Sequence, residues 1–359
     1  MMMSLSIRPL IFSGSDYEIG FQQGESCSAS IQQAVEEVFS LKEVLQNKPA
    51  LLPKSFFKVF AKRRADKMLR KDLFSQYPKH AERIRGIAEA SKVDISSLLL
   101  IQMLEMAIAA CTSLGFFSEV TSTNQTILAK NFDYANFAKP YSLVCQTRPS
   151  EGYETLCCRL TPLSGSLDGM NEHGLSMTYN LARSIDTPEY HIPTSVVMQE
   201  MLETCKSTRE GVDFLNRVKI GGHDGIITLA DPTNDIRTVE LSSQHMQLFE
   251  SQSEIVINTN HYQSAEMKLV EKTPVYPNSP PRFERAKKLL ENKTNIDESM
   301  IKAVLRDHGT DNIPSDTTIC MHSEMFGTWR SMIMYPKKRA MLLLFGHPCE
   351  NEYQEIKFS

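Results

Sequence analysis

Apolar positions in the first 110 residues recur every three or four residues, a spacing that predicts helices. A short opening strand is expected at 6–12, and the run Leu51-Leu52-Pro53 interrupts the helical pattern. The pattern therefore predicts a mostly helical N-terminal segment, with helices at 16–45, 55–69, 79–91 and 95–110.

From Cys111 onward the pattern changes to apolar and β-branched runs separated by polar turns. Two pairs of helices interrupt these runs, at 193–205 with 208–218 and at 282–291 with 297–307. Such an order predicts two packed sheets covered by helices, an α+β layered arrangement. A turn is expected at 168–174. Beyond the first hairpin, the expected strands are 141–147, 153–161, 165–167, 175–179, 225–230, 236–241, 245–250, 254–258, 317–321, 329–335 and 340–345.

A hairpin opens this second part. Residues 114–120 and 126–129 supply its strands, and a polar run between them supplies the turn. Because a hairpin returns its second strand beside the start of its first, Lys130 and Asp133 are expected near Cys111. The pattern thus predicts a thiol, a cation and a carboxylate together at a strand end. The alternative for Cys111 is a buried structural cysteine.

Composition and charge narrow the function classes. The chain has 359 residues, 41% of them apolar, and a formal charge of −4 with acidic and basic residues interspersed. This distribution shows no overall excess of basic residues of the kind that binds nucleic acid or an anionic membrane. No apolar run reaches the roughly eighteen residues that a membrane helix needs. The basic cluster at 58–71 suggests a phosphate or coenzyme A site, but a solvated helix face is the favoured interpretation.

The eight cysteines indicate reduced thiols and a cytoplasmic protein, because they are too sparse for a disulfide framework. The neighbours Cys157 and Cys158 are expected on opposite faces of one strand. No secretory signal is expected at the start of the chain. His308, Cys320 and His322 have the chemistry of zinc ligands, but without paired ligand spacing we expect no metal and no cofactor.

Four short patches, in order along the chain, resemble one known family. Together they resemble the N-terminal-nucleophile amidases of the linear-amide C–N hydrolase group. That group includes the acyl-coenzyme A:6-aminopenicillanate acyltransferases, acid ceramidase-like amidases and, more distantly, choloylglycine hydrolases. The resemblance implies a four-layer αββα sandwich with a helical N-terminal pro-segment. The patches are Cys111-Thr112-Ser113 with Ala129 to Tyr134, Asp168 to Leu175 with Asn180, Ile257 to His261, and Ser279 to Arg285.

The resemblance also implies self-cleavage of the Ala110–Cys111 bond. Residues 1–110 and 111–359 would stay associated as one globular unit, and Cys111 would gain a free α-amine. An α-amine has a pKa of about 7.7–8.0, against about 10.4 for a lysine amine, so it suits the role of base better than Lys130. The acyltransferases carry glycine before the cysteine, where this chain has Ala110.

The remaining patches imply supporting roles. Asp133 would orient the α-ammonium group, and Lys130 stands where choloylglycine hydrolases carry an arginine. Asn180, or the backbone N–H after it, and the Asn260 side chain would donate hydrogen bonds to the oxyanion. Arg282 would point toward the site. Structural roles are the alternatives: a turn residue for Asp133, an exposed strand cation for Lys130 and a strand cap for Asn260. We expect Asn171 to form a turn, His261 to be structural and Arg285 to pair with a carboxylate.

The sequence thus predicts a self-processing amidohydrolase or acyltransferase that acts through a Cys111 acyl-thioester. Its expected partners are a small-molecule amide or acyl donor and its own cleaved N-terminal chain, and a homo-oligomer stays open. Two alternatives remain: an uncleaved pseudoenzyme that acts as a binding scaffold, and a papain-like cysteine peptidase. Penicillin-type acyl exchange, N-acyl amino acid or β-alanyl amine hydrolysis and N-acylethanolamine hydrolysis are all open as reactions.

Overall fold

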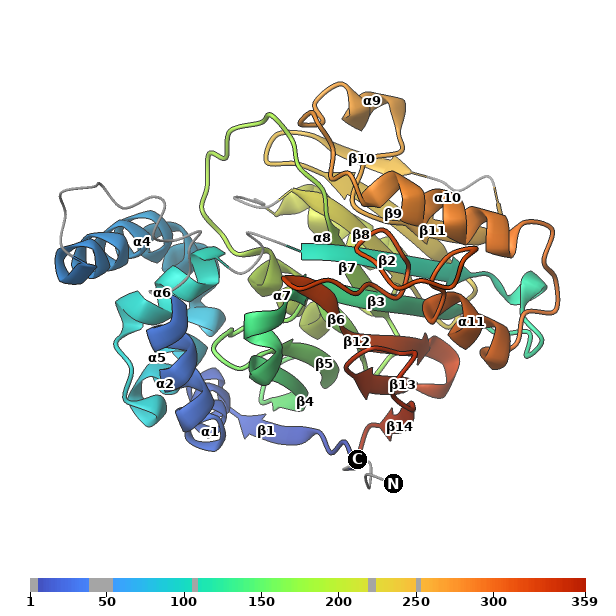
Figure 1. Ribbon diagram of the computed structural model, residues 1–359. Helices are drawn as coiled ribbons and strands as arrows, with labels where there is room; N and C mark the ends of the chain where they lie inside the picture. Colours follow the sequence, from blue (N-terminus) through green and yellow to red (C-terminus); the bar gives the residue numbers. More distant parts are fainter. Residues whose placement is uncertain (1–5, 39–53, 105–108, 219–223, 250–252) are drawn as a thin grey trace.

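Two β-sheets form the centre of the computed structural model, which describes residues 6–38, 54–104, 109–218, 224–249 and 253–359 (Figure 1). The eight-stranded sheet has the order β1 (Leu10–Gly14), β4 (Ser142–Pro149), β5 (Thr155–Leu160), β6 (Asp168–Asn171), β7 (Ser176–Leu181), β8 (Gly225–Ala230), β9 (Ile236–Leu241) and β10 (Met246–Phe249). The six-stranded sheet has the order β11 (Ile255–Asn258), β2 (Ala109–Phe116), β3 (Ile127–Ala135), β12 (Phe326–Tyr335), β13 (Ala340–Phe345) and β14 (Gln354–Lys357).

The two sheets pack against each other, and helices cover their outer faces. Inward side chains such as Leu128 and Met332 of one sheet share a buried cluster with Leu156 and Met170 of the other. On the outer faces, α7 (Thr194–Thr204) and α8 (Thr208–Arg217) pack on the eight-stranded sheet. The six-stranded sheet is covered by α10 (Ser279–Leu290) and α11 (Glu298–Leu305). This arrangement confirms the expected αββα sandwich, because each sheet is apolar on the face toward its partner and on the face toward its helices.

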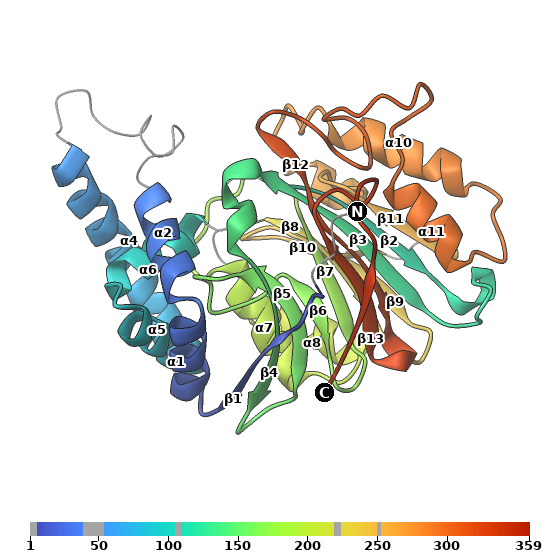
Figure 2. The same ribbon diagram turned by 60° about the horizontal axis from the view of Figure 1, so that its bottom comes forward.

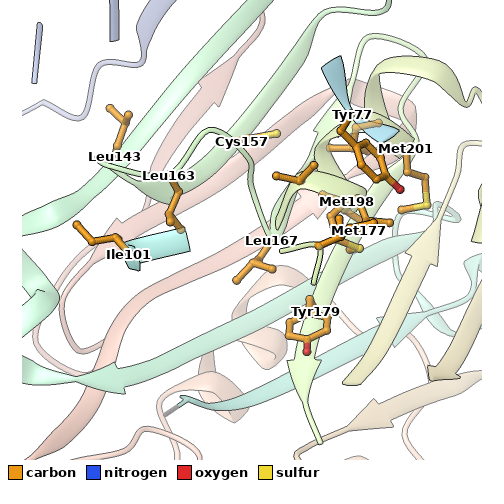
Figure 3. Packing of buried hydrophobic residues seen from close by; sticks show 14 of the residues in the cluster. Tyr77, Ile101, Leu143, Cys157, Leu163, Leu167, Met177, Tyr179, Met198 and Met201 are labelled. Carbon is orange, nitrogen blue, oxygen red and sulfur yellow. The ribbon is translucent and has the colours of Figure 1, made fainter. Parts of the chain in front are cut away.

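The N-terminal helices form a bundle beside the eight-stranded sheet (Figure 2). They are α1 (Asp16–Ser26), α2 (Ser28–Val38), α4 (Lys54–Gln76), α5 (Pro78–Ser91) and α6 (Ile95–Leu104). The bundle shares the largest buried cluster with the sheet, and Figure 3 shows Ile101 of α6 with Leu163, Leu167 and Met177 in that cluster. The N-terminal segment also supplies β1, which pairs in parallel with β4. Strand pairing and apolar packing therefore both join this segment to the rest of the chain.

Several expected boundaries are wrong. The opening strand lies at 10–14, and the first long helix is interrupted at Cys27, with residues 39–53 outside the described part. The helix expected at 95–110 ends at Leu104, and after the undescribed residues 105–108 the chain is a strand that pairs with β3. An apolar run without clear periodicity can form a helix or a strand, so pairing with the neighbouring strand β3 determines which of the two forms.

Two other local expectations also fail. The first half of the turn expected at 168–174 is the strand β6, paired with β5 and β7. The strand expected at 317–321 is irregular, and the Thr318 hydroxyl lies within hydrogen-bond distance of two nearby backbone carbonyls, those of Ser315 and Cys320, to either of which it can donate. The expected opposite facing of Cys157 and Cys158 is confirmed, since they belong to different buried clusters. No helix in the described part of the chain has the length and apolar character needed to cross a membrane.

Candidate active site

The hairpin of β2 and β3 places the predicted nucleophile beside its predicted partners. The two strands are antiparallel, with Ala110 opposite Asp133, Cys111 opposite Phe132 and Ser113 opposite Lys130. The proximity expected from the hairpin is therefore confirmed. Cys111 is fully buried. Burial raises the pKa of its thiol to about 11, and the charge of Lys130 acts in the opposite direction. The uncleaved chain thus holds Cys111 as a thiol at neutral pH.

Two buried polar side chains converge on the backbone of Cys111. The Cys111 N–H donates to Asn260 Oδ1 at 2.8 Å, and Arg282 Nη1 donates to the Cys111 carbonyl at 2.6 Å. Arg282 Nη2 also donates to Asn260 Oδ1 at 2.8 Å, which joins the two side chains. Cys111, Asn260 and Arg282 therefore form one hydrogen-bonded unit. In sequence, Asn260 lies 149 positions and Arg282 171 positions after Cys111.

Local structure fixes both partners. Asn260 follows the end of β11, its backbone N–H donates to Ser279 Oγ at 2.7 Å, and its Nδ2 donates to the Leu181 carbonyl at 2.8 Å. Arg282 lies in the first turn of α10, where Nε donates to the Asn278 carbonyl at 3.0 Å. His261 Nδ1 lies 2.7 Å from Ser279 Oγ, so His261 supports the Asn260 loop and has the structural place expected for it.

Asp133 is a buried carboxylate with one open acceptor. Its Oδ1 accepts a hydrogen bond from Thr328 Oγ1 at 2.6 Å. Among the described residues its Oδ2 has no hydrogen-bond partner, and the nearest recorded cation, Arg282 Nη1, lies 3.7 Å away, too far for a hydrogen bond. Burial raises the pKa of Asp133 to about 7, against the opposing charge of Arg282. A cationic donor placed at Oδ2 would stabilise the charged carboxylate and lower the pKa of Asp133.

The raised pKa of Asp133 gives a stability prediction for the uncleaved chain. Between about pH 4 and about pH 7 the folded chain keeps a proton on Asp133 that the unfolded chain releases, so Asp133 costs stability as the pH rises through that window. We expect Asp133→Asn, made in an uncleavable Cys111→Ala chain, to be stabilising at about pH 8 and close to neutral at about pH 4. Urea unfolding of both chains at both pH values measures the difference. A difference that does not change with pH would contradict the argument.

Lys130 is held in a buried ion network rather than exposed on its strand. Its Nζ donates to Asp168 Oδ1 at 2.6 Å and to the Tyr179 carbonyl. Arg330 Nη2 donates to the other oxygen of Asp168 at 2.6 Å. Although burial opposes it, the two cations hold the pKa of Asp168 below its ordinary value. We did not single out Asp168 and Arg330 from the sequence; the signal for Asp168 was its position at the start of the second patch.

Asn180 lies on β7 of the eight-stranded sheet, which contacts β2 of the other sheet. Its Oδ1 accepts from Ser113 Oγ at 2.6 Å, and its Nδ2 donates to the Asn258 carbonyl at 3.1 Å. The side chain therefore joins β7 to β2 and β11, two residues along β2 from Cys111. Two simpler expectations are confirmed: Asn171 Oδ1 caps its turn by accepting from two backbone N–H groups, and Arg285 pairs with Asp307.

A cavity of about 160 Å³ opens beside Asn260. Pro274, Val275 and Tyr276 give it an apolar wall, and charged residues lie at its rim. The Arg183 guanidinium lies over the Tyr276 ring, 4.6 Å from its centroid. Because Asn260 contacts both the cavity and Cys111, this cavity is the candidate substrate pocket. Sequence reasoning missed Tyr276, which lies in a Pro-rich loop without a motif of its own.

Comparison with known families gives one match. Residues 120–350 match the family described as acyl-coenzyme A:6-aminopenicillanic acid acyl-transferase. The matched region contains Lys130, Asp133, Asn180, Asn260 and Arg282, and it begins after Cys111. No curated protein sequence matches the chain.

Comparison with solved structures gives distant similarities. An N-acylethanolamine-hydrolyzing acid amidase ortholog from Caenorhabditis elegans is 16% identical, over 63% of this chain and 93% of its own, with a TM-score of 0.46. A variant of the conjugated bile acid hydrolase from Clostridium perfringens is 13% identical, over 69% and 97%, with a TM-score of 0.46. Penicillin V acylase from Agrobacterium tumefaciens is 16% identical, over 66% and 83%, with a TM-score of 0.44.

Proposed function

Because the chain belongs to the acyl-coenzyme A:6-aminopenicillanic acid acyl-transferase family, we propose that it is a self-processing amidohydrolase or acyltransferase whose N-terminal nucleophile is Cys111. One observation carries this proposal. Asn260 and Arg282 bind the backbone nitrogen and carbonyl of Cys111, rather than its sulfur. An enzyme that uses the α-amine of its nucleophile as the base needs its site built around that nitrogen.

Maturation would begin with attack of the Cys111 sulfur on the Ala110 carbonyl carbon. The C–N bond between the two residues breaks, the nitrogen takes up a proton, and a thioester joins Ala110 to Cys111. Water then hydrolyses the thioester, which leaves a carboxylate on Ala110 and a free thiol and α-amine on Cys111. Residues 1–110 would stay bound to residues 111–359 through β1 and the shared apolar cluster.

In turnover, the new α-amine would take the thiol proton, and the thiolate would attack the carbonyl of a linear amide. The amide nitrogen then leaves with that proton, and an acyl-thioester remains on Cys111 until water or an acceptor amine releases the acyl group. The open Oδ2 of Asp133 would hold the α-ammonium form. Among the described residues, the recorded imidazole–sulfur contacts are those of His322 with Cys320 and Cys349, so the papain-like alternative has no support from the described contacts of Cys111.

Asn260 has two separable polar groups in this scheme. Its Oδ1 holds the Cys111 nitrogen, and its Nδ2 donates one N–H to the Leu181 carbonyl. We propose that the second N–H of Nδ2 donates to the oxyanion. The cavity beside it would receive the acyl group against its apolar wall.

Exchanging these groups tests the proposal. Asn260→Asp keeps the acceptor and removes the donor, so we expect it to lower kcat by about 10²–10³-fold, as Asn260→Ala should, because either change deletes one oxyanion donor. Steady-state kinetics on cleaved, folded protein measure this loss. If Asn260→Asp retained activity within about twofold of the parent, far short of a donor's expected effect, Asn260 would act only through Oδ1.

A further inference from the structure

Four possible metal ligands meet beside the start of β12 and the end of β13 in the six-stranded sheet. They come from three segments: His308 after α11, Cys320 and His322 before β12, and Cys349 after β13. One ligand atom from each residue lies within 4.8 Å of all the others. His308, Cys320 and His322 are at least partly buried and Cys349 is exposed, so an ion could reach the cluster from one side.

The distances within the cluster fit one face of a coordination tetrahedron. Cys320 Sγ lies 3.5 Å from Cys349 Sγ, and His322 Nε2 lies 3.4 Å from the first sulfur and 3.3 Å from the second. With Zn–S bonds of about 2.3 Å and Zn–N bonds of about 2.0–2.1 Å, a tetrahedral site places two sulfurs about 3.8 Å apart and a sulfur and a nitrogen about 3.6 Å apart. Small movements would complete such a face.

The histidines supply the remaining geometry. Nε2 of His308 is buried and has no hydrogen-bond partner among the described residues, so it offers an unused lone pair or proton in a polar cluster. The ring of His322 stacks on that of His347, with centroids 3.7 Å apart and an interplanar angle of 16°, which fixes the plane of the ligand ring.

We propose that His308, Cys320, His322 and Cys349 form a structural zinc site. Two thiolates and two neutral imidazoles balance the charge of Zn²⁺, and four protein ligands leave no open position for substrate, as in structural rather than catalytic zinc sites. Sequence spacing did not predict this site, because Cys320 and His322 form the only close pair and the other two ligands come from distant loops.

The site would fasten the three loops that it joins. Hydrogen bonds already hold these loops together: the Cys320 N–H donates to the Asp307 carbonyl at 3.0 Å, and the side-chain Nε of Arg306 donates to the Pro348 carbonyl at 2.7 Å. The Met321 N–H donates to Thr328 Oγ1 at 2.9 Å, and the same hydroxyl donates to Asp133. A metal at this cluster would therefore also steady the residue that orients Asp133.

Metal analysis of the reduced full-length chain tests the proposal. Protein purified without chelators should contain roughly one zinc ion per chain, and Cys349→Ser and Cys320→Ser should lower that content at least about tenfold. Cys205→Ser is the matched control, because Cys205 is also a free cysteine but lies outside the cluster, and it should keep the metal. After a chelator has removed the zinc, the protein should bind one equivalent of Co²⁺. The product should show thiolate-to-metal absorption and the visible bands of tetrahedral cobalt.

Three results would overturn the proposal. The first is a parent chain that carries no zinc and, after chelation, binds no Co²⁺. The second is metal binding that the cluster variants keep at the level of the Cys205→Ser control. The third is a disulfide between Cys320 and Cys349 in freshly purified protein, found by peptide mass, because a disulfide would consume both sulfur ligands.

Discussion

Cys111→Ala should leave the chain in one piece and without measurable amide hydrolysis or acyl transfer. The substitution removes the atom that we propose attacks both the Ala110 carbonyl and the substrate, so maturation and turnover should fail together. Loss of the catalytic nucleophile lowers kcat by about 10⁴–10⁶-fold in hydrolases that form a covalent acyl-enzyme. Intact-mass measurement of the purified chain and a substrate screen with linear amides check the two effects separately.

Other buried cysteines give the control for this substitution. Cys205→Ser should be cleaved and active, because Cys205 lies near α7 and α8 rather than in the site. Inactivation of the mature parent by iodoacetamide should follow the labelling of Cys111, located by peptide mass, and not the labelling of the exposed Cys349. Cleavage or activity that persisted in Cys111→Ala would contradict the assignment of the nucleophile.

Asp133→Asn should nearly abolish turnover by the cleaved protein, by about 10³-fold or more, on the scale of losses seen when an orienting carboxylate is neutralised. Among the described residues the Oδ2 of Asp133 has no hydrogen-bond partner, so it could accept from the proposed α-ammonium group, whereas an amide of the same shape cannot balance an ammonium charge. The same substitution should stabilise the uncleaved chain, as argued above. A substitution that lowers activity but raises stability indicates a group whose buried charge destabilises the fold and is kept for function.

The kinetics should be normalised to the cleaved fraction, measured by intact mass, so that a defect in maturation is not mistaken for one in turnover. Asp231→Asn is a suitable control, because Asp231 is also a buried carboxylate but accepts hydrogen bonds from Thr208 at the start of α8, outside the recorded contacts of Cys111. Retention of more than about a tenth of the parent kcat by Asp133→Asn, well above the loss expected for an orienting carboxylate, would reduce Asp133 to a structural residue.

Local patterns predicted the part of the site that local structure builds. Alternating apolar residues and a polar turn were sufficient to place Lys130 and Asp133 beside Cys111, because hairpin register depends on neighbouring residues. The layered α+β order followed from the same periodicities. The contacts of Asn260 and Arg282 with the Cys111 backbone depend on how β11 and α10 dock, and only the resemblance to a known family pointed to them.

Tertiary contacts decided what the patterns missed. A buried strand cation needs an acidic partner, and Lys130 finds Asp168 on the other sheet, in a segment whose Asp and Gly favoured a turn. The metal cluster escaped detection for the same reason, since its ligands are close only after three loops meet. Sequence spacing can reveal ligands that lie on one helix or one loop, whereas these four residues come from three separate loops.

The most direct test is the intact mass of the wild-type protein, freshly purified and fully unfolded, together with sequencing of its N-termini. The account predicts two chains, 1–110 and 111–359, with the second beginning at Cys111, and activity that rises as the uncleaved chain disappears. A single uncleaved chain that is fully active would contradict the N-terminal-nucleophile mechanism, because Cys111 would then have no α-amine to act as its base.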